Sequence, residues 1–259
     1  MVRLENVTFS YSQKPVLSAL DLTVPEGDFC AIVGPNGSGK TTLLKLMAGL
    51  LKPQQGRVSA NGKNIAGLSP MEMAKMISYV PQHQDVVFDF TVFDTVMMGR
   101  NPYQNRWTDA SESDVKVVRE VLEQTGLAHL SNRMLSHLSG GECQRVMIAR
   151  AMAQQTPVML LDEPLSNLDV GYRFEVMDVL RELNRKQHAT VIIILHDFSF
   201  VSQYATSTLM LHGNGEHRYG TTREILNNDH IRHAFGLSDD YHLDDKGHIF
   251  RDKAPFRNS

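Results

Sequence analysis

Short runs of apolar residues along this chain predict two kinds of β-strand. Residues 2–9 alternate between apolar and polar, and residues 56–60 form a second candidate strand before a turn at Asn61 and Gly62. Alternation is typical of a strand with one face buried and the other in solvent. These two segments therefore predict an antiparallel sheet.

Three other runs, residues 29–33, 158–161 and 191–195, are apolar throughout. Such runs are typical of strands buried on both faces, as in a parallel sheet covered by helices. Helical periodicity follows the first run, in residues 41–48, and separates the other two, in residues 172–186. This alternation of strands and helices predicts an α/β fold with a central parallel sheet.

Residues from about 85 to 155 contain few strand candidates and two helical patterns, at 112–124 and 140–153. We predict a helical insertion into the α/β core. Two further helices are predicted to start at Ser69 and Thr221, because each is followed three residues later by a glutamate in a capping pattern. The sequence after residue 220 becomes polar and histidine-containing, and it predicts no function of its own.

Composition narrows the class of protein. Of 259 residues, 42% are hydrophobic and 21% charged, as in an ordinary soluble domain. No apolar stretch reaches the roughly 18 to 20 residues of a membrane span, and the first residues lack the apolar core of a signal peptide, so we expect a cytoplasmic location. A net charge of -3 gives no basic field for nucleic acid, so no nucleic-acid partner is expected.

The cysteine and histidine residues predict neither a disulfide nor a metal site. The two cysteines, Cys30 and Cys143, form neither a disulfide framework nor a zinc motif, and we interpret both as reduced thiols. His230 and His233 stand three residues apart on a predicted helix. Because two imidazoles without further ligands rarely define a metal site, we expect both to be solvated.

The segment from Gly34 to Thr41 fits the pattern G-x-x-x-x-G-K-[ST] between a predicted strand and a predicted helix. Small residues let backbone N–H groups close around phosphate oxygens, and the start of the following helix favours anions. Lys40 is predicted to reach the outer phosphates and Thr41 a magnesium ion. Otherwise this would be a glycine-rich turn with an exposed lysine. The predicted phosphate-binding residues are Gly34, Pro35, Asn36, Gly37, Ser38, Gly39, Lys40, Thr41 and Thr42.

Two acidic residues, Asp162 and Glu163, follow the apolar run at 158–161, so they emerge at the carboxyl end of a strand, where open α/β sheets bind ligands. Neighbouring strand residues face opposite ways, so we expect the two carboxylates to have different tasks. His196 ends the next strand. Without the glycine loop, these would be solvated acids and a structural histidine.

The segment Ser139-Gly140-Gly141-Glu142 is a capping box that starts the helix at 140–153. A capped helix start with two glycines is also an accessible site for an anion. Gln82, after Pro81, is by itself only a loop residue. Tyr11 lies shortly before the glycine loop, where an aromatic ring could stack on a base or could simply end a strand.

These segments occur in a fixed order, namely the glycine loop, Gln82, Leu138 to Glu142, Leu160 to Glu163 and His196. The chain thereby resembles the ATP-binding-cassette (ABC) ATPases, over residues 1 to about 220. The resemblance implies a P-loop NTPase (RecA-like) core with an antiparallel β subdomain and an inserted α-helical subdomain at about 85–155. It also implies ATP and Mg²⁺ as ligands. The extension at 221–259 is expected to pack on this domain or to trail from it.

The resemblance also implies roles for individual residues. Tyr11 would stack on adenine, and Gln82 would touch magnesium together with Thr41 and Asp162. Glu163 would orient or deprotonate the attacking water, and His196 would contact the γ-phosphate. The segment at 139–142 would meet the nucleotide of a second copy across a homodimer seam, which Asp169, in the segment 166–169, would also approach.

The family resemblance extends to a function. Residues 88–102 are similar to those of import cassettes for iron-siderophores, haem and vitamin B12, which implies a bacterial ATP-driven importer of a metal chelate. Its partners would be integral membrane permease subunits and, indirectly, an external substrate-binding protein, with the ATPase at the cytoplasmic face of the inner membrane. Met97 and Met98 would either accept a permease helix or pack within the insertion. Alternatives are an exporter ATPase, a soluble cassette acting on ribosomes or nucleic acid, and a regulatory module without hydrolysis.

Overall fold

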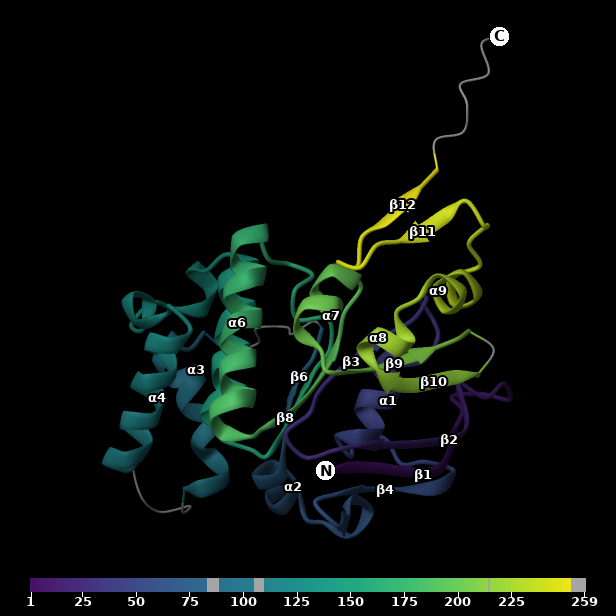
Figure 1. Ribbon diagram of the computed structural model, residues 1–259. Helices are drawn as coiled ribbons and strands as arrows, with labels where there is room; N and C mark the ends of the chain where they lie inside the picture. The colour runs from purple at the N-terminus through teal and green to yellow at the C-terminus, as the bar shows by residue number, and fades with distance from the viewer. Residues whose placement is uncertain (83–88, 105–109, 214, 253–259) are drawn as a thin grey trace.

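A six-stranded sheet forms the centre of the protein in the computed structural model, which describes residues 1–82, 89–104, 110–213 and 215–252 (Figure 1). Its strand order is β10-β9-β3-β8-β7-β6, and all neighbours are parallel except the pair β9 and β10. The strands are β3 (Phe29–Val33), β6 (Ile77–Val80), β7 (Val158–Leu161), β8 (Thr190–Ile194), β9 (Ser207–Leu211) and β10 (His217–Thr221).

An antiparallel sheet of order β2-β1-β4-β5 lies beside the central sheet, and its pairing between segments 2–9 and 55–60 is the one predicted. The strand β2 was not predicted, although its residues alternate in burial. The strands are β1 (Val2–Phe9), β2 (Leu17–Val24), β4 (Gln55–Ala60) and β5 (Lys63–Asn64).

The predicted helices at 112–124 and 140–153 are confirmed at both ends, and those at 41–48 and 172–186 differ by one or two residues at each end. The capping boxes at Ser69, Ser139 and Thr221 are present as predicted. The helices are α1 (Lys40–Met47), α2 (Pro70–Met76), α3 (Val92–Met97), α4 (Glu112–Gln124), α5 (Gly140–Ala153), α6 (Val170–Gln187), α7 (Phe198–Tyr204), α8 (Thr222–Ile225) and α9 (Asn228–Phe235), with 3₁₀ turns at Ile65–Gly67, Met98–Tyr103, Ala128–Leu130 and Leu135–His137.

Two hydrophobic cores share the central sheet, one on each face. Within β3, Ala31 and Val33 join the core that contains α3 to α7, whereas Cys30 and Ile32 join the core that contains α1 and the antiparallel sheet. Alternate residues of a strand point to opposite faces, which explains why these strands are apolar at every position. In Figure 1, α3, α4 and α6 accordingly lie on one side of the sheet, and β1, β2 and β4 on the other.

Helix α5 runs through the larger core and is buried along most of its length. Just beyond its C-terminal end, the Gln154 amide donates to the carbonyl oxygens of Ala74, in α2, and of Ile77, the first residue of β6. One helix therefore connects the segment at 139–142 with the edge strand of the central sheet. Met97 packs against the same core, so of the two expectations for the methionine pair, packing within the insertion applies to Met97.

Part of the C-terminal extension packs on the domain. Ile225, Ile231 and Ala234 belong to the larger core, and the rings of Phe198 and Phe235 meet edge to face. Beyond them, β11 (Tyr241–Leu243) and β12 (Ile249–Arg251) form an antiparallel pair that the sequence did not predict.

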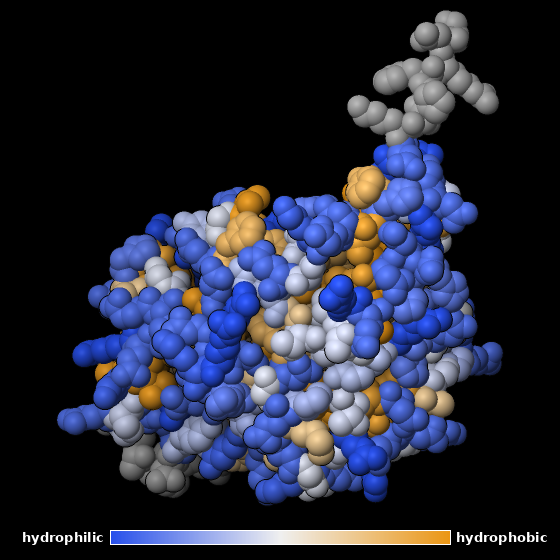
Figure 2. All heavy atoms as spheres, viewed as in Figure 1, coloured by the Kyte–Doolittle hydropathy of each residue, from blue (hydrophilic) through white to orange (hydrophobic). Residues whose placement is uncertain are grey.

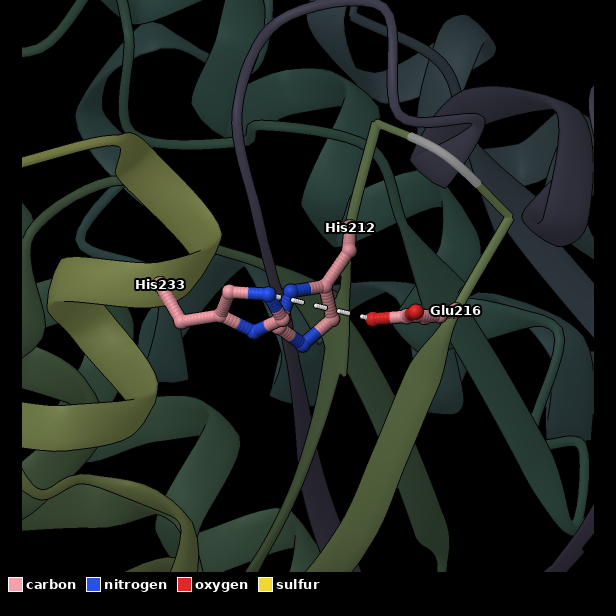
Figure 3. A group of neighbouring side chains, drawn as sticks. All are labelled: His212, Glu216 and His233. Atoms are coloured by element: carbon pink, nitrogen blue, oxygen red, sulfur yellow. Dashed lines mark ion pairs between the residues drawn. The ribbon is translucent and has the colours of Figure 1, made fainter.

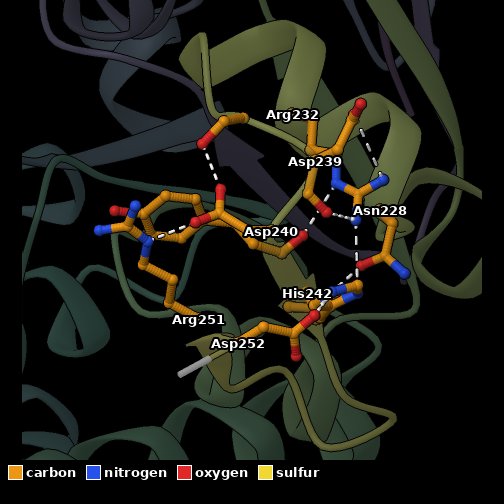
Figure 4. Close-up of polar contacts among 10 residues, drawn as sticks. Asn228, Arg232, Asp239, Asp240, His242, Arg251 and Asp252 are labelled. Carbon is orange, nitrogen blue, oxygen red and sulfur yellow. Dashed lines mark hydrogen bonds and ion pairs between the residues drawn. The ribbon is translucent and has the colours of Figure 1, made fainter. Parts of the chain in front are cut away.

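Polar contacts attach this pair of strands to α9 (Figure 4). The Arg232 guanidinium donates to the carbonyl oxygens of Tyr241 at 2.8 Å and Asp239 at 2.6 Å. Asn228 accepts from the Leu243 N–H group, and Asp240 pairs with Arg251. These contacts lie near the surface, so they fix geometry more than they add stability.

The face of the molecule in Figure 2 is mostly hydrophilic, with separate hydrophobic patches. In the part of the chain that the structure describes, no helix is both long and apolar enough to cross a bilayer.

Candidate active site

Many of the predicted ATP-binding residues meet in a pocket of about 710 Å³ at the carboxyl ends of β3, β7 and β8. These three strands are neighbours in the sheet, so segments that lie far apart in sequence arrive at the same edge. The pocket is lined by Tyr11, Val16, Asn36, Gly37, Gly39, Lys40, Thr41, Thr42, Gln82, Glu163 and His196.

The glycine loop begins at a point where no side chain fits. Gly34 has a φ of 149°, and a Cβ atom there would stand 2.3 Å from the carbonyl oxygen of Leu211. The Lys40 ammonium group donates to the carbonyl oxygens of Gly34 and Pro35, at 2.9 Å each. Burial lowers the pKa of Lys40, although the carboxylates of Glu163 and Asp162 oppose this shift. The loop is thus folded around the lysine that the motif assigns to phosphate.

Ser38 gives a direct test of whether the loop suits a phosphate group. Its hydroxyl is buried and, among the described residues, has no hydrogen-bond partner. A buried polar atom without a partner costs free energy, and a phosphate oxygen would satisfy it. The loop therefore fits the anionic part of ATP.

Asp162 lies directly beneath the glycine loop. The Thr41 hydroxyl donates to its Oδ1 atom at 3.0 Å, and the Tyr79 hydroxyl donates to Oδ2 at 3.2 Å. Burial raises the pKa of Asp162, and the hydrogen bonds from Thr41 and Tyr79 act against that rise. A hydroxyl and a carboxylate in contact are suitable oxygen ligands for Mg²⁺. This donor set fits the predicted ion.

Glu163 bridges two of the other predicted residues. The Gln82 amide donates to Glu163 Oε2 at 2.6 Å, and His196 Nε2 lies 2.6 Å from Oε1. The backbone of Glu163 has a φ of 49°, which few residues with a side chain adopt. The turn that produces this conformation is closed by Ser166, whose hydroxyl donates to the Glu163 carbonyl oxygen at 3.1 Å. The carboxylate is therefore held at the pocket wall by residues of two other segments, Gln82 and His196.

Tyr11 stands at the rim of the pocket with 63% of its surface exposed. Its hydroxyl accepts from Thr42 at 3.3 Å, and its ring meets Phe9 edge to face. The ring is positioned beside the phosphate loop and is accessible. Stacking on adenine stays a prediction.

The segment at 139–142 does not line this pocket but lies on the surface at the start of α5. A Cβ atom on Gly141 would stand 3.2 Å from the carbonyl oxygen of Asn167, so this segment packs against the turn at 166–169. Asp169 is exposed at the N-cap position of α6, and its side chain makes no capping hydrogen bond. The structure therefore brings the two predicted seam segments together, away from the chain's own phosphate loop.

Two residues around the site were absent from the sequence-based set. The Tyr79 hydroxyl donates to Asp162. Tyr79 lies on β6, which pairs in parallel with β7, the strand before Asp162, although about 80 residues of chain separate the two strands. Val16 lines the pocket and stands close to Gly39. No local pattern in the sequence distinguishes either residue from an ordinary strand or loop residue.

Residues 17–166 match the family model described as ABC transporter. The chain belongs to this family. The ABC ATPase is 40% identical to the achromobactin transport ATP-binding protein of Dickeya dadantii over 231 residues, which cover 89% of this chain and 86% of that protein. It is also 35% identical to the petrobactin import ATP-binding protein of Bacillus anthracis, over 93% of this chain and 88% of the relative.

Solved structures agree with this assignment. The ABC ATPase superposes with a TM-score of 0.80 on a chain of a transporter described as metal-chelate type, in an inward-facing conformation, with 31% identity over 99% of this chain and 98% of that one. It superposes with a TM-score of 0.76 on the dimeric ATP-binding cassette MJ0796 bound to ADP and phosphate, with 29% identity over 86% and 99% of the two chains. The predicted P-loop fold and ATP hydrolysis are thereby confirmed.

Proposed function

We propose that this ABC ATPase drives a bacterial importer of metal chelates, of the iron-siderophore, haem or cobalamin class. The observation that supports the proposal is the likeness, over most of both chains, to proteins named for achromobactin transport and petrobactin import. A relative named for cobalamin import is 37% identical over 85% of this chain, although only 55% of that relative is covered. The cargo class is therefore broader than one siderophore.

The pocket supplies the groups that phosphoryl transfer to water needs. Lys40, the loop N–H groups and the Ser38 hydroxyl would bind the β- and γ-phosphate oxygens. Mg²⁺ held by Thr41 and Asp162, with Gln82 nearby, would neutralise charge that develops on those oxygens.

Glu163 is suited to hold and deprotonate the attacking water, because its carboxylate is fixed between Gln82 and His196. His196 is just under half exposed and faces the pocket, so its ring would reach the γ-phosphate as well as the carboxylate. Since Gln82 contacts Glu163 directly, a movement of the segment before the helical insertion would displace the catalytic carboxylate. This contact is a direct route by which a partner protein would control hydrolysis.

A homodimer would complete each site. The segment Ser139 to Glu142 presents the N-terminus of α5 at the surface, and a Cβ atom at Gly140 would meet nothing within 4 Å. An exposed helix start with open space around its glycine is suited to a phosphate on a second copy. Asp169 lies exposed beside this segment, where it would face the same seam.

The remaining partners follow from the proposed transport reaction. The ATPase would bind membrane permease subunits at the cytoplasmic face of the inner membrane, and an external binding protein would deliver the chelate to the permease. Residues 89–102, which contain α3 and the β-bridge between Thr91 and Met134, are the described part of the segment proposed to receive the permease.

The first experiment is affinity purification of the tagged full chain from gently solubilised membranes, with mass spectrometry of the proteins that accompany it. An untagged strain serves as the control. We expect a polytopic permease to be recovered, and its substrate pocket would narrow the cargo class. Recovery of ribosomal or DNA-associated proteins without any membrane protein would contradict the importer proposal while leaving ATP hydrolysis intact.

A further inference from the structure

Three potential metal ligands meet on the side of the domain where the C-terminal extension begins (Figure 3). His212 follows β9 and Glu216 precedes β10, and the His212 N–H group donates to the Glu216 carbonyl oxygen at 2.9 Å. This pairing extends the two strands by one residue each and places both side chains on the same face. His233 reaches the same place from α9, which Ile231 and Ala234 anchor in the core.

The three side chains are close enough to share an ion. One donor atom from each lies within 4.8 Å of the others, and His233 Nε2 is 4.0 Å from Glu216 Oε2. Ligands around a tetrahedral ion at about 2.1 Å lie roughly 3.4 Å apart, so a contraction of up to about 1.4 Å is needed. The side chains of His233 and Glu216 are 56% and 58% exposed, which leaves room for that rotation.

His212 is the independent sign that this cluster binds a ligand. The residue is only 4% exposed, and among the described residues neither of its ring nitrogens has a hydrogen-bond partner. Buried imidazoles normally have a partner, because an unsatisfied polar group costs free energy.

We propose that His212, Glu216 and His233 bind a divalent first-row transition-metal ion, such as Zn²⁺ or Fe²⁺. Two imidazoles and one carboxylate suit these ions, whereas Mg²⁺ prefers oxygen ligands such as those at Asp162. The exposed side of the cluster leaves a coordination position for water. This site is separate from the ATP pocket, whose lining includes none of the three residues.

The ion would join two parts of the fold that are far apart in the sequence. It would tie α9, the first long helix of the extension, to the β9–β10 hairpin. Strand β9 pairs with β3. The carbonyl oxygen of Leu211, the residue before His212, lies so close to Gly34 that no Cβ atom fits there. Metal occupancy would therefore stabilise the extension against the strand that precedes the phosphate loop.

The test is a Co²⁺ titration of the metal-stripped, nucleotide-free full chain, followed by visible absorption and by competition with Zn²⁺. We expect one high-affinity ion per chain. Because changes in outer-shell residues already weaken metal binding about 10- to 100-fold, loss of one of three direct ligands in His212→Ala or His233→Ala should weaken it at least 100-fold. His233 is exposed, so His233→Ala gives the decisive result if His212→Ala does not fold.

The matched control is His248→Ala, because His248 is also exposed and lies 3.0 Å from a carboxylate, that of Asp244. This control should retain the wild-type affinity. A parallel titration of His196→Ala removes the histidine–carboxylate pair of the ATP pocket and should leave the high-affinity ion in place. Absence of high-affinity binding, its persistence in His233→Ala, or its loss in His248→Ala or His196→Ala would overturn the proposal.

Discussion

Replacing Glu163 by glutamine tests the central assignment of the ATP pocket. The substitution preserves the length and shape of the side chain but removes its charge and its ability to take a proton. The carbonyl oxygen of the new amide can still accept from Gln82, and its NH₂ group can donate to a neutral His196 ring. Both contacts of 2.6 Å thus have replacements, and we expect the free energy of unfolding to change by no more than about 1 kcal/mol.

The effect on hydrolysis should be much larger than the effect on folding. A positioned general base contributes roughly 10²- to 10⁴-fold to a rate, which corresponds to about 3 to 5 kcal/mol of activation free energy. Binding should persist, because the phosphate loop and Asp162 are unchanged. We therefore expect Glu163→Gln to bind ATP normally, to release phosphate at least about 100 times more slowly, and to accumulate as an ATP-bound dimer.

Phosphate release at saturating Mg²⁺-ATP measures the rate, and size-exclusion chromatography with ATP measures the dimer. The matched control is Glu182→Gln on α6, because Glu182 is exposed and pairs only with Lys186 among the salt bridges of the described residues. This control should keep the wild-type rate. Phosphate release by Glu163→Gln within about threefold of wild type would refute the assignment of Glu163 as the base.

Three further substitutions test other parts of the structure. Burial raises the folded-state pKa of Asp162, so ionisation of this carboxyl costs stability once the pH rises above the pKa of an unfolded-state aspartate. Asp162→Asn should therefore raise the nucleotide-free Tm at pH 7.5, with a smaller gain near pH 4. The same substitution should abolish Mg²⁺-dependent hydrolysis. Arg100→Leu leaves a buried carboxylate unpaired and should cost about 3 to 5 kcal/mol in urea unfolding, whereas Lys186→Ala in an exposed pair should cost under about 0.5 kcal/mol. Gly99→Ala would bring a Cβ atom to 2.2 Å from a carbonyl oxygen of α5 and should lower the free energy of unfolding by roughly 1 to 3 kcal/mol. The control Gly67→Ala meets open space and should change the free energy of unfolding little. Equal costs for the two substitutions would contradict the packing described.

Local patterns in the sequence predicted the parts of the fold that depend on neighbouring residues. The glycine loop, the capping boxes and the bounds of α4 and α5 are all encoded within a few residues of chain. The fully apolar runs also identified β3, β7 and β8, because burial on both faces requires apolar residues throughout. The site residues on those strands could therefore be placed at one edge before the structure was known.

Features that depend on pairing between distant segments could not be predicted in this way. The strand β6 has only four residues, and its place is set by β7, about 80 residues later. The positive φ of Glu163 has no signature in its own sequence. The prediction for His230 was wrong, since this residue is half-buried and its ring contacts the carbonyl oxygen of Ile225, whereas His233 is exposed as expected but lies beside a buried histidine from another element.

Helix α5 connects two places that must respond to each other if the chain works as a dimer. Its 14 residues span about 21 Å, and its sides are enclosed by the larger core, so it can bend little. In mechanical terms it is a strut: one end presents the segment at 139–142, and the other is fastened through Gln154 to the start of β6. In a dimer, a displacement of the segment at 139–142 would therefore be transmitted along α5 to the strand that leads to Gln82. Since Gln82 contacts Glu163, the same displacement would reach the proposed catalytic base without any rearrangement of the core.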